Sequence, residues 1–513
     1  MASWGLRYPG DRMNIPATVT LPFSTSRRQD PVSWIVSIAL CVVTTCFFLG
    51  LSMQFWHWFV IPTAIGAILI VRDGVEWLRG RVDVFDPVGL IGLFGLHYFL
   101  LAPFLHVWWD FWWEYRFNPL EWRPWLGRMA ILNLIGLIGY RFAMQMAHNH
   151  APLPRKSWQL NWKRFSVVMP IALVGSALLQ SWIYLDQGGL FGYIQTYEES
   201  LGTWSKAFQG RGWQFVLAES FPILSALTYI LLLRKHPLLR KNVAVVLFLG
   251  FQLVMELFFG GLRGSRSNVI FGLFWTIGLV HFYVRRITRK QIIAGALVVF
   301  AYMNVYYFYK HGGVEALMSA ANRSSYKAIA GIKGDRDEKK FILLHDFGRA
   351  DIQALALYLI ATGDDYRYGL GRSYLGGFAS IVPRAIWPDR PQTVRKERTE
   401  LLYGARSPSS RNVGAQVMWM FGAPGEAMLN FGVLAAPFPF LVWGFAVGWV
   451  ALLFRRLPRD DTRALLLPFL VGLSLIMFIG ESHIIVFWIV KDGLVPSVVL
   501  FLCSDRKLAP ARV

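Results

Sequence analysis

Long apolar blocks recur along the whole chain, and they constrain its fold more than any other feature. Each block has roughly 20 residues, the length that an α-helix needs to cross ~30 Å of hydrocarbon. The sequence therefore predicts an all-α polytopic membrane protein with about 12 transmembrane helices. The predicted spans are residues 32–52, 55–71, 87–105, 127–146, 166–185, 214–233, 243–260, 268–284, 291–309, 430–454, 464–481 and 483–502.

The composition agrees with this class. Only 16% of the 513 residues are charged, whereas an ordinary soluble protein has about 25%, which excludes a soluble enzyme and a disordered chain. Cys41, Cys46 and Cys503 lie in apolar stretches and form no CxxC motif or Cys/His cluster, so neither a zinc site nor a disulfide framework is indicated. Residues 1–30 lack the short apolar core of a removable signal peptide. The first span is expected to serve as the insertion signal.

The net charge of +21 would suggest nucleic acid in a soluble protein. Here the basic clusters fall in alternate short loops, for example at residues 155–164, 234–241 and 285–290. Lys and Arg accumulate on the cytoplasmic side of membrane proteins, so both termini are predicted to be cytoplasmic and no nucleic-acid partner is expected. The predicted organisation is a cytoplasmic tail (1–31), helices 1 to 9 (32–309), a large periplasmic loop (310–425), helices 10 to 12 (426–502) and a second cytoplasmic tail (503–513).

A tryptophan-rich stretch, residues 106–126, is predicted to lie outside. Its indole rings suit the headgroup layer, where the N–H stays hydrated. A platform on which sugars stack is the alternative interpretation.

The external loop carries arginines that topology does not require. Arg outnumbers Lys about two to one between residues 310 and 425, and a guanidinium binds phosphate through a planar fork. This pattern favours a lipid-linked phosphate or pyrophosphate ligand, while a basic face that binds headgroups is the alternative. The candidate ligands in this loop are Arg349, Arg372, Arg384, Arg390 and Arg411.

A second arginine pair, Arg263 and Arg266, lies in the external turn "GGLRGSRSN". Ser267 or Asn268 could cap the next helix, so N–H groups and two guanidiniums would point at one external anion. A plain turn against lipid headgroups is the alternative. Within the predicted spans, Arg141 is expected to face the protein interior, and Lys491 and Asp492 are expected to pair inside the bundle.

Several motifs are absent from the sequence. It has no Walker loop and no HExxH, so neither an ATP-driven transporter nor a metalloprotease is predicted. The "DRD" of residues 335–337 is placed outside the cell, where cytosolic nucleotide sugars are absent. We therefore expect no metal site and no cofactor.

Four stretches together resemble a known family. The run "GLGRSYLGGFASIVPRAIWPDRP" (369–391) resembles the "G-(K/R)-(S/T)-Y-L … (I/V)-P-R-x-(I/L)-W-P-x-(K/R)-P" stretch of O-antigen and oligosaccharide repeat-unit polymerases of the Wzy type. The "GSRS" of 264–267 looks like their "GSR" turn, with Ser in place of the commoner final Gly. "GAPGEAMLNFGVLAAP" (422–437) is similar to their "E-x-x-x-N-F-G" entry into a late span, and "DQGGLFGYI" resembles an early external loop.

The resemblance implies a GT-C-like, metal-independent glycosyltransferase of the bacterial inner membrane. It would move a growing glycan of lipopolysaccharide or exopolysaccharide from undecaprenyl pyrophosphate onto a lipid-linked repeat unit at the periplasmic face. Arg263 or Arg266 would hold one pyrophosphate, and Arg372 and Arg384 would hold the second or orient the loop. A chain-length regulator and a flippase are the partners it implies, beside the lipid-linked oligosaccharide and the bilayer.

Transfer to a sugar hydroxyl needs a base within hydrogen-bond reach. The candidates are Glu426, which is slightly favoured because it lies in the late motif, and His345, Asp346, Asp351, Glu481 and His483. Two other functions fit the external arginines. These are an O-antigen ligase, and a flippase that transports a polysaccharide or a lipid-linked oligosaccharide.

Overall fold

The structure is a computed structural model, and it describes residues 30–112, 118–151, 156–199, 211–233, 235–263, 266–318, 340, 342–363, 366–394 and 421–508. These residues are almost entirely helical. Two short strands, β1 (Lys156–Leu160) and β2 (Ser504–Leu508), pair antiparallel with Trp158 opposite Arg506.

The α-helices of the described chain have the following bounds. They are α1 (Pro31–Leu51), α2 (Val60–Leu78), α3 (Pro87–Leu96), α4 (Ala102–Trp109), α5 (Arg123–His150), α6 (Trp162–Asp186), α7 (Gly189–Glu199), α8 (Gly212–Ala218), α9 (Phe221–Leu232), α10 (Asn242–Phe259), α11 (Arg266–Tyr283), α12 (Arg289–Met318), α15 (Ala350–Thr362), α16 (Arg372–Ala379), α19 (Gly422–Phe431), α20 (Phe438–Arg456), α21 (Leu467–Ile479), α22 (Ser482–Trp488) and α23 (Val495–Leu502).

Short 3₁₀-helical and π-helical segments connect or continue these helices. The 3₁₀ turns are η2 (Met53–Phe55), η5 (Pro237–Arg240), η6 (Gly261–Arg263), η8 (Val433–Ala435) and η9 (Thr462–Leu466). Three π-helical segments are η3 (His97–Leu101), η7 (Ile342–Asp346) and η10 (Ile489–Leu494). Each π segment carries an ionisable side chain, and such segments occur frequently at functional sites.

The all-α polytopic prediction is confirmed at the level of fold class. The predicted spans lie mostly in helices, although 55–71 begins before α2 and 430–454 covers the end of α19, η8 and α20. Among the described residues, nine helices are long and apolar enough to cross a membrane. Helix α2 extends to Leu78, seven residues past the predicted end at 71, and carries Arg72, Asp73 and Glu76 inside it. The count of twelve spans stays a prediction.

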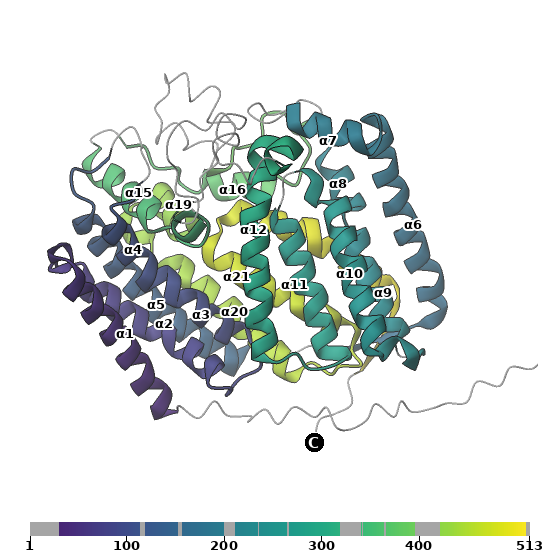
Figure 1. Cartoon of the computed structure of the whole chain (residues 1–513), viewed down its shortest axis with the longest axis horizontal. Coiled ribbons are helices and arrows are strands. Elements are labelled where there is room, and N and C mark those ends of the chain that lie inside the picture. Colours follow the sequence, from purple (N-terminus) through teal and green to yellow (C-terminus); the bar gives the residue numbers. More distant parts are fainter. Residues whose placement is uncertain are drawn as a thin grey trace, which may run out of the picture.

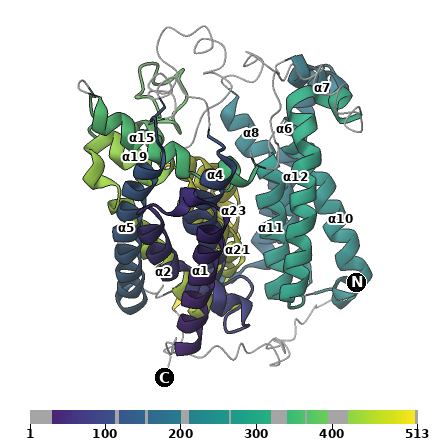
Figure 2. The ribbon, with the colours of Figure 1, turned by 60° about the vertical axis from the view of Figure 1, so that its left-hand side comes forward.

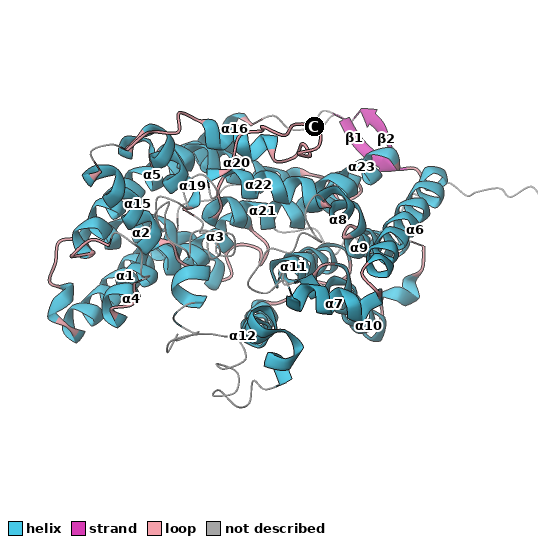
Figure 3. Cartoon of the chain, turned by 90° about the horizontal axis from the view of Figure 1, so that it is seen from above, coloured by secondary structure: helices cyan, strands magenta, loops and turns pink. Residues whose placement is uncertain are grey.

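The helices pack as two groups that meet at α21 (Figures 1 and 3). The larger core joins α1 to α5 with α15, α19 and α20, and its centre includes Phe59, Phe104 and Tyr140. The second core joins α6, α9, α10, α11 and α23 around Leu227 and Leu279. Helix α12 stands at the side of the second group (Figure 3).

Small residues bring α5 and α20 into direct backbone contact. Gly444 and Gly448 are spaced as GxxxG, and a Cβ atom would lie 2.3 Å from the carbonyl oxygen of Tyr140 at Gly444 and 2.6 Å from that of Met144 at Gly448. Lipid tails are as apolar as the helices themselves, so close van der Waals packing drives helix association in a bilayer. This contact fixes α20 against the first group.

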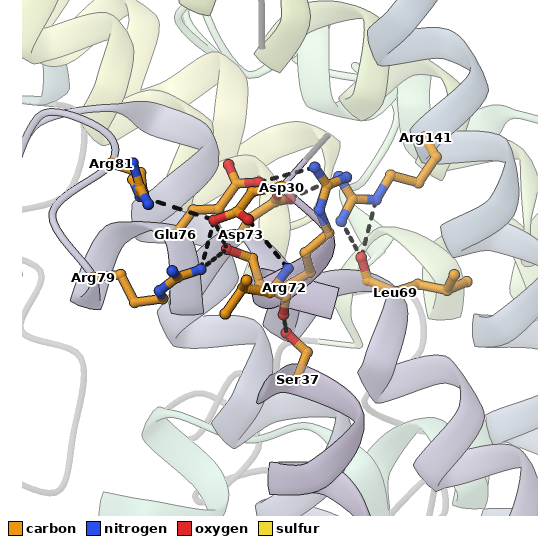
Figure 4. A network of polar contacts seen from close by, with 11 residues as sticks. Asp30, Ser37, Leu69, Arg72, Asp73, Glu76, Arg79, Arg81 and Arg141 are labelled. Carbon is orange, nitrogen blue, oxygen red and sulfur yellow. Dashed lines mark hydrogen bonds and ion pairs between the residues drawn. The ribbon is translucent and has the colours of Figure 1, made fainter. Parts of the chain in front are cut away.

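Charged side chains inside the first group are paired, among them Arg141 (Figure 4). The Nη1 atom of Arg141 lies 2.8 Å from Oδ2 of Asp73, and the guanidinium also donates to the carbonyl of Leu69. Arg72 pairs with Glu76 at 2.9 Å, one turn along α2. These pairs explain how α2 continues as a helix through residues that the sequence suggests are a loop.

The two ends of the bundle differ. Helices α7, α15, α16 and α19 gather at one end, and the start of α1 and the C-terminal strand lie at the other (Figures 1 and 2). The described parts of the 310–425 segment therefore form one cap over the helix ends, which we call the loop end.

Candidate functional site at the loop end

The backbone of residues 369–371 docks on the end of α19 and then starts α16. The N–H groups of Gly369 and Leu370 donate to the carbonyls of Leu429 and Asn430, at 3.1 and 3.0 Å. Gly371 has φ of +85°, a conformation that favours glycine, and its N–H donates to the Asn430 side chain at 3.0 Å. Two of the four stretches that carry the family resemblance, 369–391 and 422–437, are thus in direct contact.

Glu426 lies at the centre of this contact and is fully buried. Its Oε1 accepts hydrogen bonds from the hydroxyls of Ser373 and Ser482, and its Oε2 accepts the N–H of Ser482, all at 2.7 Å. Asn430, one turn later on the same face, donates to Ser373 at 2.7 Å. Burial raises the pKa of Glu426, against the opposing effect of these hydrogen bonds. The carboxyl group therefore joins α16, α19 and α22 into one unit.

A carboxylate–imidazole pair follows at the start of α22. Oε2 of Glu481 lies 3.3 Å from Nδ1 of His483, and Oε1 of Glu481 accepts the N–H of Phe421. Glu481 is fully buried, whereas the His483 side chain is partly exposed. A carboxylate behind one ring nitrogen orients the imidazole for proton transfer at the other. Among the predicted bases, this pair has the geometry best suited to proton transfer.

Helix α16 packs on that pair and turns an amphiphilic face outward. A Cβ atom at Gly377 would lie 3.1 Å from the backbone nitrogen of His483. The outward side chains are what we call the α16 surface: Arg372, Leu375, Phe378, Arg384, Ile386 and Trp387. Phe378 and Ile386 are 62% and 75% exposed, so this stretch of chain exposes apolar as well as cationic side chains.

The arginines of the loop have different environments. Arg372 and Arg384 are exposed, as a phosphate ligand requires. Arg390 instead donates to the carbonyls of Ala379 and Ser380, at 3.1 and 2.8 Å, and closes the turn that follows α16. Burial and the nearby Arg384 lower the pKa of Arg390. Arg411 lies outside the described residues.

The described residues on either side of the "GSRS" motif lie at the same end of the molecule, where η6 contacts α7. Arg266 is the first residue of α11, and the side chain of Arg263 lies outside the described residues. The hydroxyl of Tyr309 donates to the carbonyl of Leu262 at 2.6 Å, and Tyr306 donates to that of Gly261. Helix α12 thus holds the residues that precede the turn.

A second cluster of predicted residues is buried under the cap. Oδ1 and Oδ2 of Asp351 lie 3.7 Å from Nε2 of His106 and 3.4 Å from Nδ1 of His345. Arg349, also buried, donates to the carbonyl of Gly348 at 2.8 Å. The side chain of Asp346 lies outside the described residues. This cluster fastens α15 to α4.

The sequence analysis did not select His106, Ser373 or Ser482. His106 begins the tryptophan-rich stretch and stacks on Trp112 with ring centroids 5.1 Å apart, and Trp112 in turn stacks on Trp122. The two serines follow Arg372 and Glu481 directly, and a search for helix-capping residues beside predicted site residues could have found them. Their role depends on Glu426, which lies more than fifty residues away from each.

The described part of the chain contains no group of three or more His, Cys, Asp or Glu side chains placed to hold a metal ion. What the site offers is exposed guanidiniums, an apolar surface and an imidazole backed by a carboxylate. Guanidiniums can bind an anion, and an imidazole backed by a carboxylate can take up a proton. In comparisons with known proteins, no family model, no curated protein and no solved structure matches this chain.

Proposed function

We propose that this chain is a repeat-unit polymerase of the Wzy type. It would transfer a glycan from undecaprenyl pyrophosphate to a lipid-linked acceptor at the periplasmic face of a bacterial inner membrane. The observation that carries the proposal is the α16 surface, where Arg372 and Arg384 stand beside exposed Leu375, Phe378 and Ile386. Cations suit the diphosphate, and apolar side chains suit the polyprenyl chain.

The proposed chemistry needs no metal. The acceptor hydroxyl oxygen attacks the anomeric carbon, the bond from that carbon to the diphosphate oxygen breaks, and the diphosphate leaves with both bonding electrons. Guanidiniums placed in advance stabilise the developing negative charge. His483, oriented by Glu481 at 3.3 Å, takes the proton of the hydroxyl. Glu426 joins α16, which begins with Arg372, to the start of α22, which carries the base.

We assign the two diphosphates to two places at the loop end. Arg372 and Arg384 take one, and Arg266 at the start of α11 takes the other. A polymerase handles two lipid-linked substrates at once, so two cationic places are expected. The chain-length regulator and the flippase remain expected partners of the same pathway.

Deletion of the gene, read on a glycan gel with wild-type complementation as control, tests the proposal. A polymerase deletion leaves products of a single repeat. Unattached polymer would indicate a ligase instead, and lipid-linked repeats trapped inside the cell would indicate a flippase. An unchanged ladder would refute all three.

A further inference from the structure

A buried lysine in the last helix is tied to the turn that we assign to a diphosphate. Lys491 is 4% exposed and lies in the π segment η10. Its Nζ atom is 3.3 Å from Oε2 of Glu219 and 3.6 Å from Oδ1 of Asp492. The ring of Trp488 adds a cation–π contact at 5.2 Å. An ionisable group at this depth is costly, so its partners indicate a specific role.

The same Glu219 oxygen reaches the start of α11. Asn268 donates to Oε2 of Glu219 at 3.4 Å, and Asn268 follows Arg266 by two residues. Glu219 itself directly follows α8. One carboxylate oxygen therefore joins the last helix to the first turn of α11.

Gly260, which precedes the turn, lies close to the side chains of Asn268 and Glu219. A Cβ atom at Gly260, which ends α10, would lie 2.9 Å from Nδ2 of Asn268 and 3.5 Å from Oε2 of Glu219. Gly260 at the end of α10 and Asn268 in the first turn of α11 therefore both lie against the carboxylate of Glu219. Arg266 belongs to that same first turn of α11.

Lys491 also connects the turn to the α16 surface. It lies nine residues after Ser482 on the continuous helix formed by α22, η10 and α23, or about 14 Å at ~1.5 Å per residue. Ser482 is held by Glu426. The helix is therefore fixed at one point to α16 and at another to the "GSRS" turn.

We propose that Lys491 and Glu219 are positioning residues that set the "GSRS" turn, and Arg266 with it, relative to the α16 surface. The inference rests on the proposed function of Arg266. Lys491 keeps the Glu219 carboxylate in place, the carboxylate holds Asn268, and Asn268 fixes the first turn of α11. The pair touches no substrate.

Binding of farnesyl pyrophosphate, a soluble lipid diphosphate, to the full-length chain in nanodiscs tests the pair. Lys491→Met and Glu219→Gln should each weaken binding about tenfold, the size of a lost charge-assisted hydrogen bond. Lys491→Arg, and the double exchange Lys491→Glu with Glu219→Lys, should bind within ~threefold of wild type, because both restore opposite charges. Lys507→Met in β2 is the control at the far end and should bind as wild type.

A second pair of variants leaves every charge in place. Gly260→Ala should weaken binding because it pushes Asn268 and Glu219 aside, and Gly250→Ala, with nothing within 4 Å on the same helix, should not. Wild-type affinity in Lys491→Met, Glu219→Gln and Gly260→Ala, with loss in Arg266→Ala, would refute the positioning role and leave the proposed function standing. A double exchange that folds but does not regain affinity would also refute it. A wild-type chain that does not bind the probe would refute the diphosphate site itself.

Discussion

Glu426 accepts the backbone N–H of Ser482 at 2.7 Å, although 56 residues separate them in sequence. The same carboxyl group accepts the hydroxyl of Ser373 from α16. Three helices therefore share one buried acceptor, and the position of the exposed arginines depends on it. Replacement by Ala would leave several buried donors without a partner, at about 1–3 kcal/mol each.

The stability of the chain should depend on pH through Glu426. Burial raises the pKa of its carboxyl group above the ordinary value of 4.5. A carboxyl group of this kind stabilises the fold fully below its unfolded pKa, and the contribution is lost as the pH rises through the folded pKa. The thermal midpoint of wild type should therefore fall, as the pH rises above the ordinary pKa of 4.5, relative to that of Glu426→Gln, which does not titrate. Parallel profiles for the two proteins would contradict this.

The contact of α16 with α22 should tolerate no added methyl group. A Cβ atom at Gly377 would come within 2.9 Å of the Ser482 hydroxyl and 3.1 Å of the His483 backbone. Gly377→Ala should lower the unfolding free energy by about 1–3 kcal/mol and shorten the glycan ladder. Gly175→Ala, which meets nothing within 4 Å, is the matched control. Equal stability of the two variants would mean that the helices are not in contact.

The effects of replacing Arg141 and Asp73 on the unfolding free energy should be coupled. Arg141→Met leaves a fully buried Asp73 carboxylate without this partner, at a cost of about 3–5 kcal/mol. The double variant with Asp73→Asn leaves no charge and should recover part of that loss. Thermal unfolding in detergent measures both. Losses that simply add would show that the two side chains do not interact.

The side of the membrane on which the cap lies is itself testable. Reporter fusions at residues 340 and 460 should report opposite sides, with 340 periplasmic and 460 cytoplasmic, because the basic short loops lie next to 460. Fusions that report the same side would refute the predicted topology, and the periplasmic reaction with it.

The sequence predicted the helical spans well because a bilayer leaves a chain little choice but helix. The end of α2 was misplaced because Arg72, Asp73 and Glu76 have the polarity of a loop, and only their pairing inside the bundle allows the helix to continue. Glu426 and Asn430 were visible as a motif, and their i, i+4 spacing already placed them on one helix face.

The side-chain pairs of the site could not be predicted from the sequence pattern. Glu426 meets Ser482, His106 meets Asp351 and Lys491 meets Glu219 across long stretches of chain, and only tertiary packing decides such pairs. Likewise, the sequence alone does not distinguish the environments of Arg390 and Arg384. One donates to carbonyls of its own turn and the other faces outward.

The central claim is that the guanidiniums of Arg384 and Arg266 at the loop end hold lipid diphosphates. Its most direct test is the glycan ladder of cells whose own gene carries Arg384→Ala or Arg266→Ala, with Arg164→Ala at the opposite end as control. Both site variants should remain in the membrane at wild-type level and lose long-chain glycan at least ~tenfold, while the control keeps it. Normal ladders in both site variants would contradict the claim.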